Sequence, residues 1–441
     1  MHTLDVVPAQ HWLYSEEQAD VVRKLVEFGL IKFSAAHNLP LKSGGTTDIY
    51  INLREARNDP GAIRYLARLF STPIERLGVH RFVEVPDAVS CLAGLLASET
   101  GLPYLTVRKE AKEGRATDAR VIGTLKDHEK VVAILDDVMT DGGSKVAPYA
   151  ACVALDLFVK ALVVLVDRQR DWPGTFRKNG MDLPVWSGMT LHDVRKHLIR
   201  TLGLMQRCDP AMEEQNPIIL ALDGRKWPEW FPFLEFVRPT GCILKANDML
   251  FNEGMKHLLP ELVVYGRIMA DIKSLDIPPT VANIFKHLEP HEVWGVTVHA
   301  SGHEEMVRQA VEAVKGTITK VLAVTVLTSF DEKACEEVYH RRPLDQVLEL
   351  AEIAHRAGAH GFVCSPQEVG VLKEKYPAKT FVIPGTRSPG ADTGAQKRIT
   401  TPREAWDAGA DHLVMGSQVT KKEDPLAEVQ RVMREELGLV C

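Results

Sequence analysis

The sequence predicts two α/β domains, the second of them a (β/α)8 barrel. Three observations lead to this barrel: eight short apolar runs in the second half, helix-like apolar spacing in most gaps, and polar residues where the runs end. Such runs between helical patterns are typical of strands in βαβ units. Eight units in roughly 225 residues match a closed barrel whose functional residues gather at the C-terminal ends of its strands. The expected strands are Ile218–Asp223, Cys242–Asn247, Ile268–Lys273, Gly295–Ala300, Ala323–Thr328, Gly361–Pro366, Phe381–Gly385 and His412–Ser417.

The first half, residues 1–203, shows the same alternation. Glu16–Phe33 reads as an opening helix, and the turn-rich segment Lys42–Asp48 precedes Ile49–Arg54. Apolar runs with helical stretches between several of them are typical of a parallel α/β sheet, and we expect strands at Phe82–Val85, Tyr104–Val107, Val131–Leu135 and Ala161–Val166. Residues 204–217 are polar and mixed in charge, which predicts a linker and leaves residues 218–441 for the barrel.

Composition narrows the class of protein. The 441 residues are enough for two or three domains with ample cores, and the net charge of −6 argues against nucleic acid as a partner. The N-terminus lacks the pattern of a signal peptide, and no apolar run is long enough to cross a membrane. The seven scattered cysteines form no C-x-x-C pair, so we expect reduced thiols in a cytoplasmic protein.

A charge cluster marks the end of the third barrel strand. Side chains of a strand alternate between its faces, so Asp271 and Lys273 should point the same way. Pro278 and Pro279 stop the strand, which leaves Asp276 on a loop beside that pair. Taken alone, such a trio is more often a surface salt bridge. Its position at the C-terminal rim of a barrel favours a catalytic role instead.

A second motif follows the strand at residues 131–135. Two acids come directly after the strand, then a glycine-rich turn, then a helix rich in Ala and Val. Backbone N–H groups of such a turn and the start of a helix can converge on a phosphate, and hydroxyl groups can add hydrogen bonds. The two acids can hold ribose hydroxyls, directly or through Mg2+. The candidate residues are Asp136, Asp137, Thr140, Asp141, Gly142, Gly143 and Ser144.

The cluster at residues 271–280, Asp271-x-Lys273-x-x-Asp276-Ile277-Pro278-x-Thr280, resembles the signature of orotidine 5′-phosphate (OMP) decarboxylases, and the resemblance runs from about residue 218 to residue 439. It implies a cofactor-free decarboxylase with the catalytic residues Lys273, Asp271, Asp276 and Lys245. It also implies a homodimer through the barrel, in which Asp276 and Thr280 reach the partner's site. The OMP- and UMP-binding residues that it implies are Asp223, Lys245, Ile277, Thr280, Thr328, Arg387, Gln396, Gly416 and Ser417.

The motif at residues 131–144 resembles the phosphoribosyl-diphosphate motif of type I phosphoribosyltransferases. Segments around Tyr50, residues 108–112 and Arg168 narrow this resemblance to the orotate phosphoribosyltransferase family. It implies Mg2+ as cofactor, and adds Lys42, Tyr50, Arg108, Lys109, Lys112 and Arg168 to the residues that bind orotate and phosphoribosyl diphosphate. A transferase ahead of a decarboxylase resembles the fused uridine 5′-monophosphate synthase family, which takes orotate through OMP to UMP.

Three positions depart from these families and leave alternatives open. Asp87 follows Val85-Pro86 where relatives carry Lys or Tyr, Glu113-Gly114 lacks an intervening His, and Ser417 stands where an Arg binds the 5′-phosphate. The first two favour an alternative in which the N-terminal half is a nucleotide-binding or dimerising module. A further alternative is a related barrel enzyme that uses Mg2+ on a sugar phosphate, and Ile277-Pro278-x-Thr280 argues against it.

Overall fold

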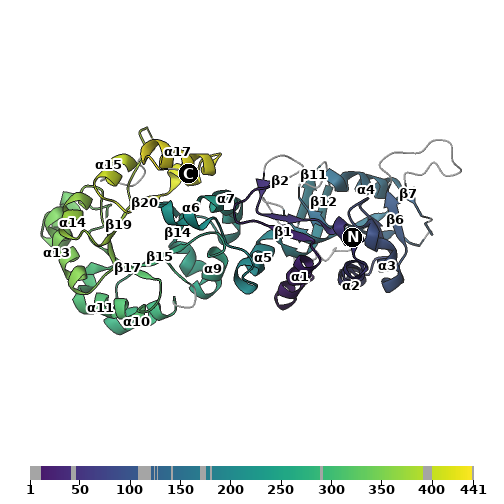
Figure 1. Ribbon diagram of the computed structural model, residues 1–441, viewed down its shortest axis with the longest axis horizontal. Coiled ribbons are helices and arrows are strands. Elements are labelled where there is room, and N and C mark those ends of the chain that lie inside the picture. The colour runs from purple at the N-terminus through teal and green to yellow at the C-terminus, as the bar shows by residue number, and fades with distance from the viewer. Residues whose placement is uncertain are drawn as a thin grey trace. The chain divides into compact units, whose positions relative to one another are not determined.

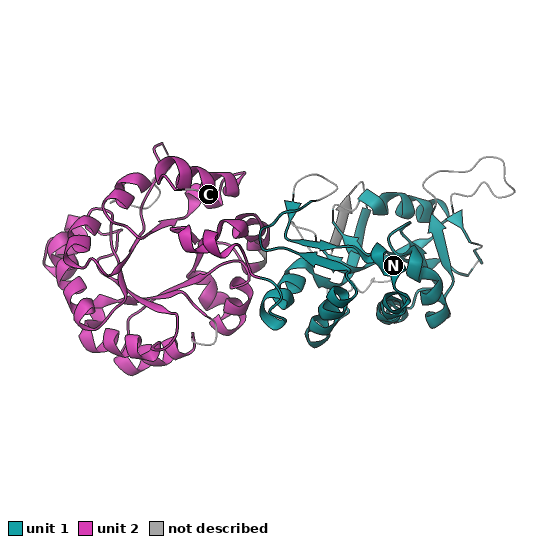
Figure 2. Cartoon of the chain, in the orientation of Figure 1, with its two compact units in different colours: residues 1–205 teal, residues 206–441 magenta. Residues whose placement is uncertain are grey.

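The computed structural model describes residues 11–40, 46–107, 121–123, 125–126, 128–140, 143–168, 175–178, 181–288, 292–390 and 400–439. Contacts divide the chain into two compact units, residues 1–205 and 206–441 (Figure 2). Among the described residues, no helix has both the length and the apolar character needed to cross a membrane.

The second unit is a closed barrel of eight parallel strands in chain order, and the last strand pairs with the first (Figure 1). The predicted (β/α)8 barrel is therefore confirmed. Its strands are β13 (Ile218–Ala221), β14 (Ile243–Ala246), β15 (Ile268–Ser274), β16 (Gly295–His299), β17 (Lys320–Val324), β18 (Gly361–Val363), β19 (Thr380–Ile383) and β20 (His412–Met415).

Large apolar side chains fill the interior of this barrel. Alternate residues of the strands point inward, and six of them form one buried cluster with Trp294, which directly precedes β16: Ile219, Ile243, Met269, Leu322, Val382 and Val414. Because the interior is packed, polar chemistry is confined to the rim at the C-terminal ends of the strands.

Helices surround the barrel (Figure 1). In α13 (Pro343–Arg356) the residues Val347, Leu350 and Ala351 recur at helical spacing and are buried, while Leu344 is exposed. The other helices are α6 (Pro210–Gln215), α7 (Phe231–Val237), α8 (Asp248–Glu253), α9 (Met255–Leu262), α10 (Pro278–Lys286), α11 (His303–Ala313), α12 (Glu332–Tyr339), α14 (Val369–Lys375), α15 (Pro402–Asp407), α16 (Ser417–Thr420) and α17 (Pro425–Arg431), with short 3-10 or π turns η3 (Trp227–Trp230), η4 (Arg238–Thr240), η6 (Ala300–Gly302) and η7 (Val432–Glu436).

The first unit is built on a mixed sheet in the order β11-β12-β10-β8-β5-β6-β7, with β9 pairing with β10. The five central strands pair in parallel, and β11 and β7 are antiparallel edges. The strands are β5 (Arg81–Glu84), β6 (Tyr104–Val107), β7 (Val121–Ile122), β8 (Val131–Leu135), β9 (Val138–Met139), β10 (Phe158–Asp167), β11 (Thr175–Lys178) and β12 (Met181–Thr190), and short strands β1 (Ile31–Phe33), β2 (Leu39–Pro40), β3 (Thr46–Thr47) and β4 (Ile49–Ile51) form two small sheets. The helices are α1 (Ser15–Glu27), α2 (Pro60–Leu77), α3 (Ser90–Thr100), α4 (Gly143–Ala154) and α5 (Leu191–Lys196), with η1 (Leu53–Asn58) and η2 (His197–Thr201).

Some predicted boundaries differ from the structure. The opening helix ends at Glu27 and is followed by Gly29 at φ +70°, a left-handed conformation that favours glycine, after which Ile31 starts a strand. Strand β17 begins at Lys320, three residues before the predicted run, and ends at Val324, four residues before the end of that run. The charged first residue is accommodated because its aliphatic stem can cover apolar surface, while its Nζ lies 5.4 Å from the centroid of the Trp294 ring. The predicted linker, 204–217, contains α6.

Candidate active site

Strand β15 brings an acid and a lysine together at the C-terminal rim. The Nζ of Lys273 lies 2.6 Å from Oδ2 of Asp271. The carboxylate is buried, whereas a third of the lysine side chain is exposed. The pair that the sequence predicted is therefore in direct contact.

A second lysine completes a chain of alternating charges. The Nζ of Lys245, at the end of the neighbouring strand β14, lies 3.2 Å from Oδ2 of Asp271 and 3.1 Å from both carboxylate oxygens of Asp223. The order along the rim is Asp223, Lys245, Asp271, Lys273. Because the two inner members, Lys245 and Asp271, each lie between opposite charges, these buried groups are compensated.

Two neutral side chains fix Asp271 and Lys273. The Thr297 hydroxyl on β16 donates to Oδ1 of Asp271 at 2.9 Å and accepts the backbone N–H of Lys273, also at 2.9 Å. The Asn247 side chain donates to the backbone carbonyl of Asp271 at 2.7 Å. Neither residue was predicted from the sequence. The sequence does hold a signal for Thr297, because it is the one hydroxyl residue of the largely apolar strand β16, which pairs with the strand that carries Asp271 and Lys273.

The backbone at Lys273 is irregular. Its φ is +45°, a left-handed conformation that is rare outside glycine, and the pairing of β15 with β16 shifts register between Ala270 and Ser274. The alternation of side chains along a regular strand predicted that Asp271 and Lys273 point the same way. The two side chains do make contact, but the strand between them is irregular, with a bulge. Strained conformations of this kind are retained where the surrounding structure holds them, often at functional sites.

The cluster shifts the pKa values of its members. Burial alone would raise the pKa of Asp271, but Lys245, Lys273 and the Thr297 hydrogen bond hold it below the usual value. Burial would lower the pKa of Lys245, and the charges of Asp271 and Asp223 outweigh this and raise it. Burial and the charge of Lys273 lower the pKa of His299, at the end of β16. The charged forms of Asp271 and Lys245 are therefore favoured, and the lowered pKa of His299 favours its neutral imidazole.

An enclosed space adjoins the cluster. A cavity of about 200 Å³ opens over the barrel core and has charged groups on one side and apolar groups on the other. Thr328, which follows β17, supplies a hydroxyl. The residues that line it are Lys245, Met269, Asp271, Lys273, Val324, Val326, Leu327, Thr328, Val363, Pro384 and Val414. Such a pocket suits a flat ring with a polar edge that faces Lys273.

Comparison with known proteins places this barrel in a family. A family model described as "Orotidine 5'-phosphate decarboxylase / HUMPS family" matches residues 216–432. A protein of Pseudoalteromonas translucida (strain TAC 125), named orotidine 5′-phosphate decarboxylase, is 38% identical over 221 residues, which cover 49% of this chain and 94% of that relative. The chain belongs to the orotidine 5′-phosphate decarboxylase family.

Two further proteins are similar to about half of the chain. The orotidine 5′-phosphate decarboxylase of Erythrobacter litoralis (strain HTCC2594) is 39% identical over 212 residues, covering 48% of this chain and 94% of that relative. The crystal structure of the decarboxylase from Lactobacillus acidophilus matches with 31% identity and a TM-score of 0.45, covering 50% of this chain and 98% of that one. The family model lies within the second unit, residues 206–441.

The remaining predicted residues of the decarboxylase site lie at different places. Asp276 does not join the charge row within this chain: it is exposed, its Oδ1 accepts the N–H of Ile277 at 2.6 Å, and among the described residues it forms no ion pair. Ile277 is also exposed, and Thr280 is partly buried in the first turn of α10. We predicted that Asp276 helps to hold the row of charges in place, but within a single chain no ion pair among the described residues supports this role.

The residues predicted to hold a phosphate lie after β19 and β20. Arg387 is partly buried and donates through Nη1 to the carbonyl of Thr386 at 2.7 Å. Gly416 precedes α16, and Ser417 is exposed in its first turn. Ser417 and Lys421 line an open cavity of about 750 Å³ beside this rim. Gln396 lies outside the described residues.

The motif after β8 in the first unit is closed by a lysine that the sequence did not suggest as a partner. Asp136 is 1% exposed, and its Oδ2 lies 2.5 Å from Nζ of Lys145 and 3.3 Å from the Ser144 hydroxyl. Lys145 also donates to the carbonyl of Val138 at 2.9 Å. Burial and the neighbouring charge of Asp136 raise the pKa of Asp137. The negative charge of the Asp136 carboxylate is therefore already compensated by the ammonium group of Lys145.

These acids do not fit a metal site made of protein ligands alone. One oxygen of Asp136 is bound to Lys145, and Oδ1 of Asp137 accepts the N–H of Val138 at 2.7 Å. Among the described residues, no group of three or more His, Cys, Asp or Glu side chains is placed to hold a metal ion. Any Mg2+ in this unit would have to gain most of its ligands from a bound diphosphate.

Other predicted transferase residues are placed only in part. Arg168 donates through Nη2 to the Thr47 hydroxyl at 3.3 Å, and Tyr50 lies on β4. Thr140 is exposed, and Gly143 and Ser144 begin α4. Asp87 has φ +67° and an exposed side chain. Lys42, Arg108, Lys109, Lys112, Asp141 and Gly142 lie outside the described residues.

Proposed function

We propose that the barrel converts OMP to UMP, with Lys273 as the group that stabilises and protonates the reacting carbon. The observation that carries this proposal is the contact between Lys273 and Asp271 at the edge of an enclosed cavity, in a chain of the decarboxylase family. Loss of CO2 leaves a carbanion at C6 of the pyrimidine. A fixed ammonium group stabilises that charge as it develops and then supplies the proton.

Asp271 contributes in two ways. It holds the Lys273 ammonium group in position through their 2.6 Å contact, and its carboxylate would lie near the carboxylate of the substrate. Two like charges about 4 Å apart repel by roughly 4 kcal/mol at an effective dielectric constant of 20. Departure of CO2 relieves this repulsion. The mechanism uses protein side chains and needs no cofactor.

We also propose that the first unit is an orotate phosphoribosyltransferase that supplies OMP, so that the chain carries out the last two steps of UMP synthesis in the cytoplasm. The support is the order of described elements between residues 131 and 154: a mostly buried strand, two acids, the short strand β9 and a helix that starts at Gly143. Mg2+ would enter with phosphoribosyl diphosphate. The assembly would be a homodimer through the barrels, with Asp276 and Thr280 directed to the partner's site.

A second candidate function for the first unit rests on the Asp136–Lys145 contact. Because the Asp136 carboxylate is already paired with Lys145, it is a weaker partner for a ribose hydroxyl or a metal ion. This observation favours a nucleotide-binding or dimerising module without transferase activity.

One assay on the intact chain separates these candidates. Orotate, phosphoribosyl diphosphate and Mg2+ are incubated with the protein, and diphosphate, OMP and UMP are followed. Release of diphosphate with accumulation of UMP supports both activities. A well-folded chain that converts added OMP to UMP but releases no diphosphate retains the decarboxylase and rejects the transferase. Turnover of OMP in the presence of a chelator excludes the alternative of a Mg2+-dependent sugar-phosphate enzyme.

A further inference from the structure

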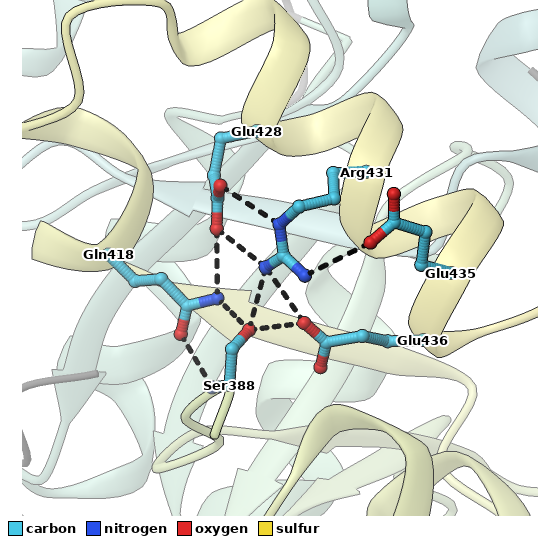
Figure 3. A network of polar contacts seen from close by, with 6 residues as sticks. All are labelled: Ser388, Gln418, Glu428, Arg431, Glu435 and Glu436. Carbon is cyan, nitrogen blue, oxygen red and sulfur yellow. Dashed lines mark hydrogen bonds and ion pairs between the residues drawn. The ribbon is translucent and has the colours of Figure 1, made fainter. Parts of the chain in front are cut away.

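A polar network ties together the segments that follow the last two barrel strands (Figure 3). Gln418, in α16, accepts the backbone N–H of Ser388 through Oε1 at 2.9 Å, and its Nε2 donates to the Ser388 hydroxyl. The side-chain amide therefore bridges the segment after β19 and the segment after β20. Both residues are less than a tenth exposed.

Helix α17 and turn η7 hold this bridge from the other side. The guanidinium of Arg431 donates to both carboxylate oxygens of Glu428, at 2.8 and 3.1 Å, and to the Ser388 hydroxyl at 3.1 Å. The Ser388 hydroxyl in turn donates to Oε1 of Glu436 at 2.5 Å. Glu436 also pairs with Arg431 at 2.8 Å, and Glu428 lies 3.5 Å from the Gln418 amide.

The charges of the network show what Arg431 does. Three carboxylates, from Glu428, Glu435 and Glu436, surround its guanidinium at 2.8 to 3.8 Å. The hydrogen bond to Arg431 lowers the pKa of Glu428, and the same bond raises the pKa of Arg431. A cation so fully compensated has little charge left for an anionic ligand, so Arg431 is placed to hold protein groups in position.

The sequence neighbours of the bridge show what is being positioned. Ser388 follows Arg387 directly, and Gln418 follows Ser417 directly. Segments after the seventh and eighth strands of such barrels are where phosphate groups bind. The single side chain of Gln418 thus sets the spacing between the two backbones that would lie on either side of a nucleotide phosphate.

We propose that Gln418, Ser388 and Arg431 are positioning residues for the 5′-phosphate end of the nucleotide. The inference rests on the proposed decarboxylase function. Chemistry at Lys273 takes place on another part of the rim, on β15, so loosening the bridge weakens the hold on the phosphate and leaves the carbanion chemistry intact. The effect must therefore depend on whether the ligand carries a phosphate.

The test compares Gln418→Ala with Gln346→Ala. Gln346 is a matched control, since it is a glutamine of the same burial (8% exposed, against 7% for Gln418) on α13, outside the network. Steady-state kinetics with OMP give KM and kcat, and calorimetry gives the affinities for UMP and for uridine, which lacks the phosphate. Ser388→Ala provides a milder second variant, because it removes the hydroxyl but keeps the backbone N–H that donates to Gln418.

We expect Gln418→Ala to raise KM for OMP and Kd for UMP by about tenfold, with kcat and the affinity for uridine within about twofold of wild type. Ser388→Ala should shift the same two quantities in the same direction, by less, and Gln346→Ala should shift neither. Equal weakening of UMP and uridine, an unchanged KM in both network variants, or a fall in kcat alone would overturn the inference. Absence of OMP turnover in the wild-type protein would instead overturn the proposed function, and the inference with it.

Discussion

Lys273 reaches Oδ2 of Asp271 at 2.6 Å from a backbone with φ +45°. A left-handed residue in a strand costs about 1–3 kcal/mol, so other interactions must hold it. Thr297 does so by accepting the N–H of Lys273 while donating to Asp271. The bulge turns the lysine toward the cavity without separating it from the acid. The Thr297 hydroxyl thus links the strained backbone of Lys273 to the buried carboxylate of Asp271.

Replacing Lys273 with Ala should abolish decarboxylation, with a loss of at least about 10³-fold in kcat, because both charge stabilisation and the proton donor are removed. Lys286→Ala, an exposed lysine on α10, should retain full activity. Release of diphosphate by the first unit should be unchanged. Parallel loss of both activities would indicate that Lys273 acts in folding.

Replacing Thr297 with Val should lower kcat for OMP by about tenfold to a hundredfold, with a smaller change in KM. The valine keeps the shape of the buried side chain but removes the hydroxyl that connects Asp271 to the Lys273 backbone, and small displacements of a catalytic group are costly. Kinetics with OMP measure the effect. An unchanged kcat would show that the bulge is held without Thr297.

The barrel could be predicted because its strands carry a repeated local signal. Each of the eight runs is short, apolar and separated by helical spacing, so the pattern alone indicated the closed topology. Strand β12 was not predicted, because Pro184 and Gly188 interrupt its apolar pattern. The first unit therefore contains a strand within its sheet, β12, that the periodicity of apolar residues does not reveal.

The site was predictable where a local motif or the family resemblance marked its residues. Asp271 and Lys273 are two residues apart, and Asp223 and Lys245 were implied by the resemblance. The role of Lys145, in contrast, arises from a contact that only folding makes. The bridge between Gln418 and Ser388 joins residues 30 positions apart and leaves no local pattern. Asp276 was expected beside Lys273, but its carboxylate accepts the N–H of the next residue.

Stability of the barrel should fall as pH falls from about 6.5 to about 4, in part through His412. Burial, then the charges of Arg267 and Lys320, lower the pKa of His412 to about 4. The unfolded chain takes up a proton near pH 6.5, while the folded chain resists it, so the contribution is present above pH 6.5 and is lost toward pH 4. Its size is about 3 kcal/mol, because one pKa unit corresponds to about 1.4 kcal/mol.

His412→Phe keeps a ring against Trp294, whose centroid lies 4.7 Å from that of His412, but removes the titrating group. Urea unfolding midpoints measured from pH 7.5 to pH 4.5 should therefore decline less steeply in this variant than in wild type. Equal slopes in the two proteins would show that His412 does not carry the effect.

Replacing Ser417 with Arg should tighten UMP binding by about tenfold to a hundredfold, because a charge-assisted hydrogen bond contributes about 1.5–3 kcal/mol. Ser417 is exposed and lines the open cavity that Lys421 also lines, so a longer side chain can be accommodated. Calorimetric titration with UMP measures the change. Val371→Arg, on the exposed face of α14, adds the same charge away from the cavity and should have no effect. If the two variants bind UMP equally, the phosphate is held elsewhere.

Asp276 provides a test of the proposed dimer. Within one chain it is exposed and makes no ion pair among the described residues, next to the exposed apolar side chains of Leu275 and Ile277. If Asp276 completes the site of a partner subunit, Asp276→Ala and Lys273→Ala should each be inactive alone. Co-expressed in equal amounts, they should regain about a quarter of wild-type OMP turnover, because half of the dimers are mixed and each mixed dimer has one intact site. Full activity of Asp276→Ala alone, or an inactive mixture in which mixed dimers are present, would contradict a shared site.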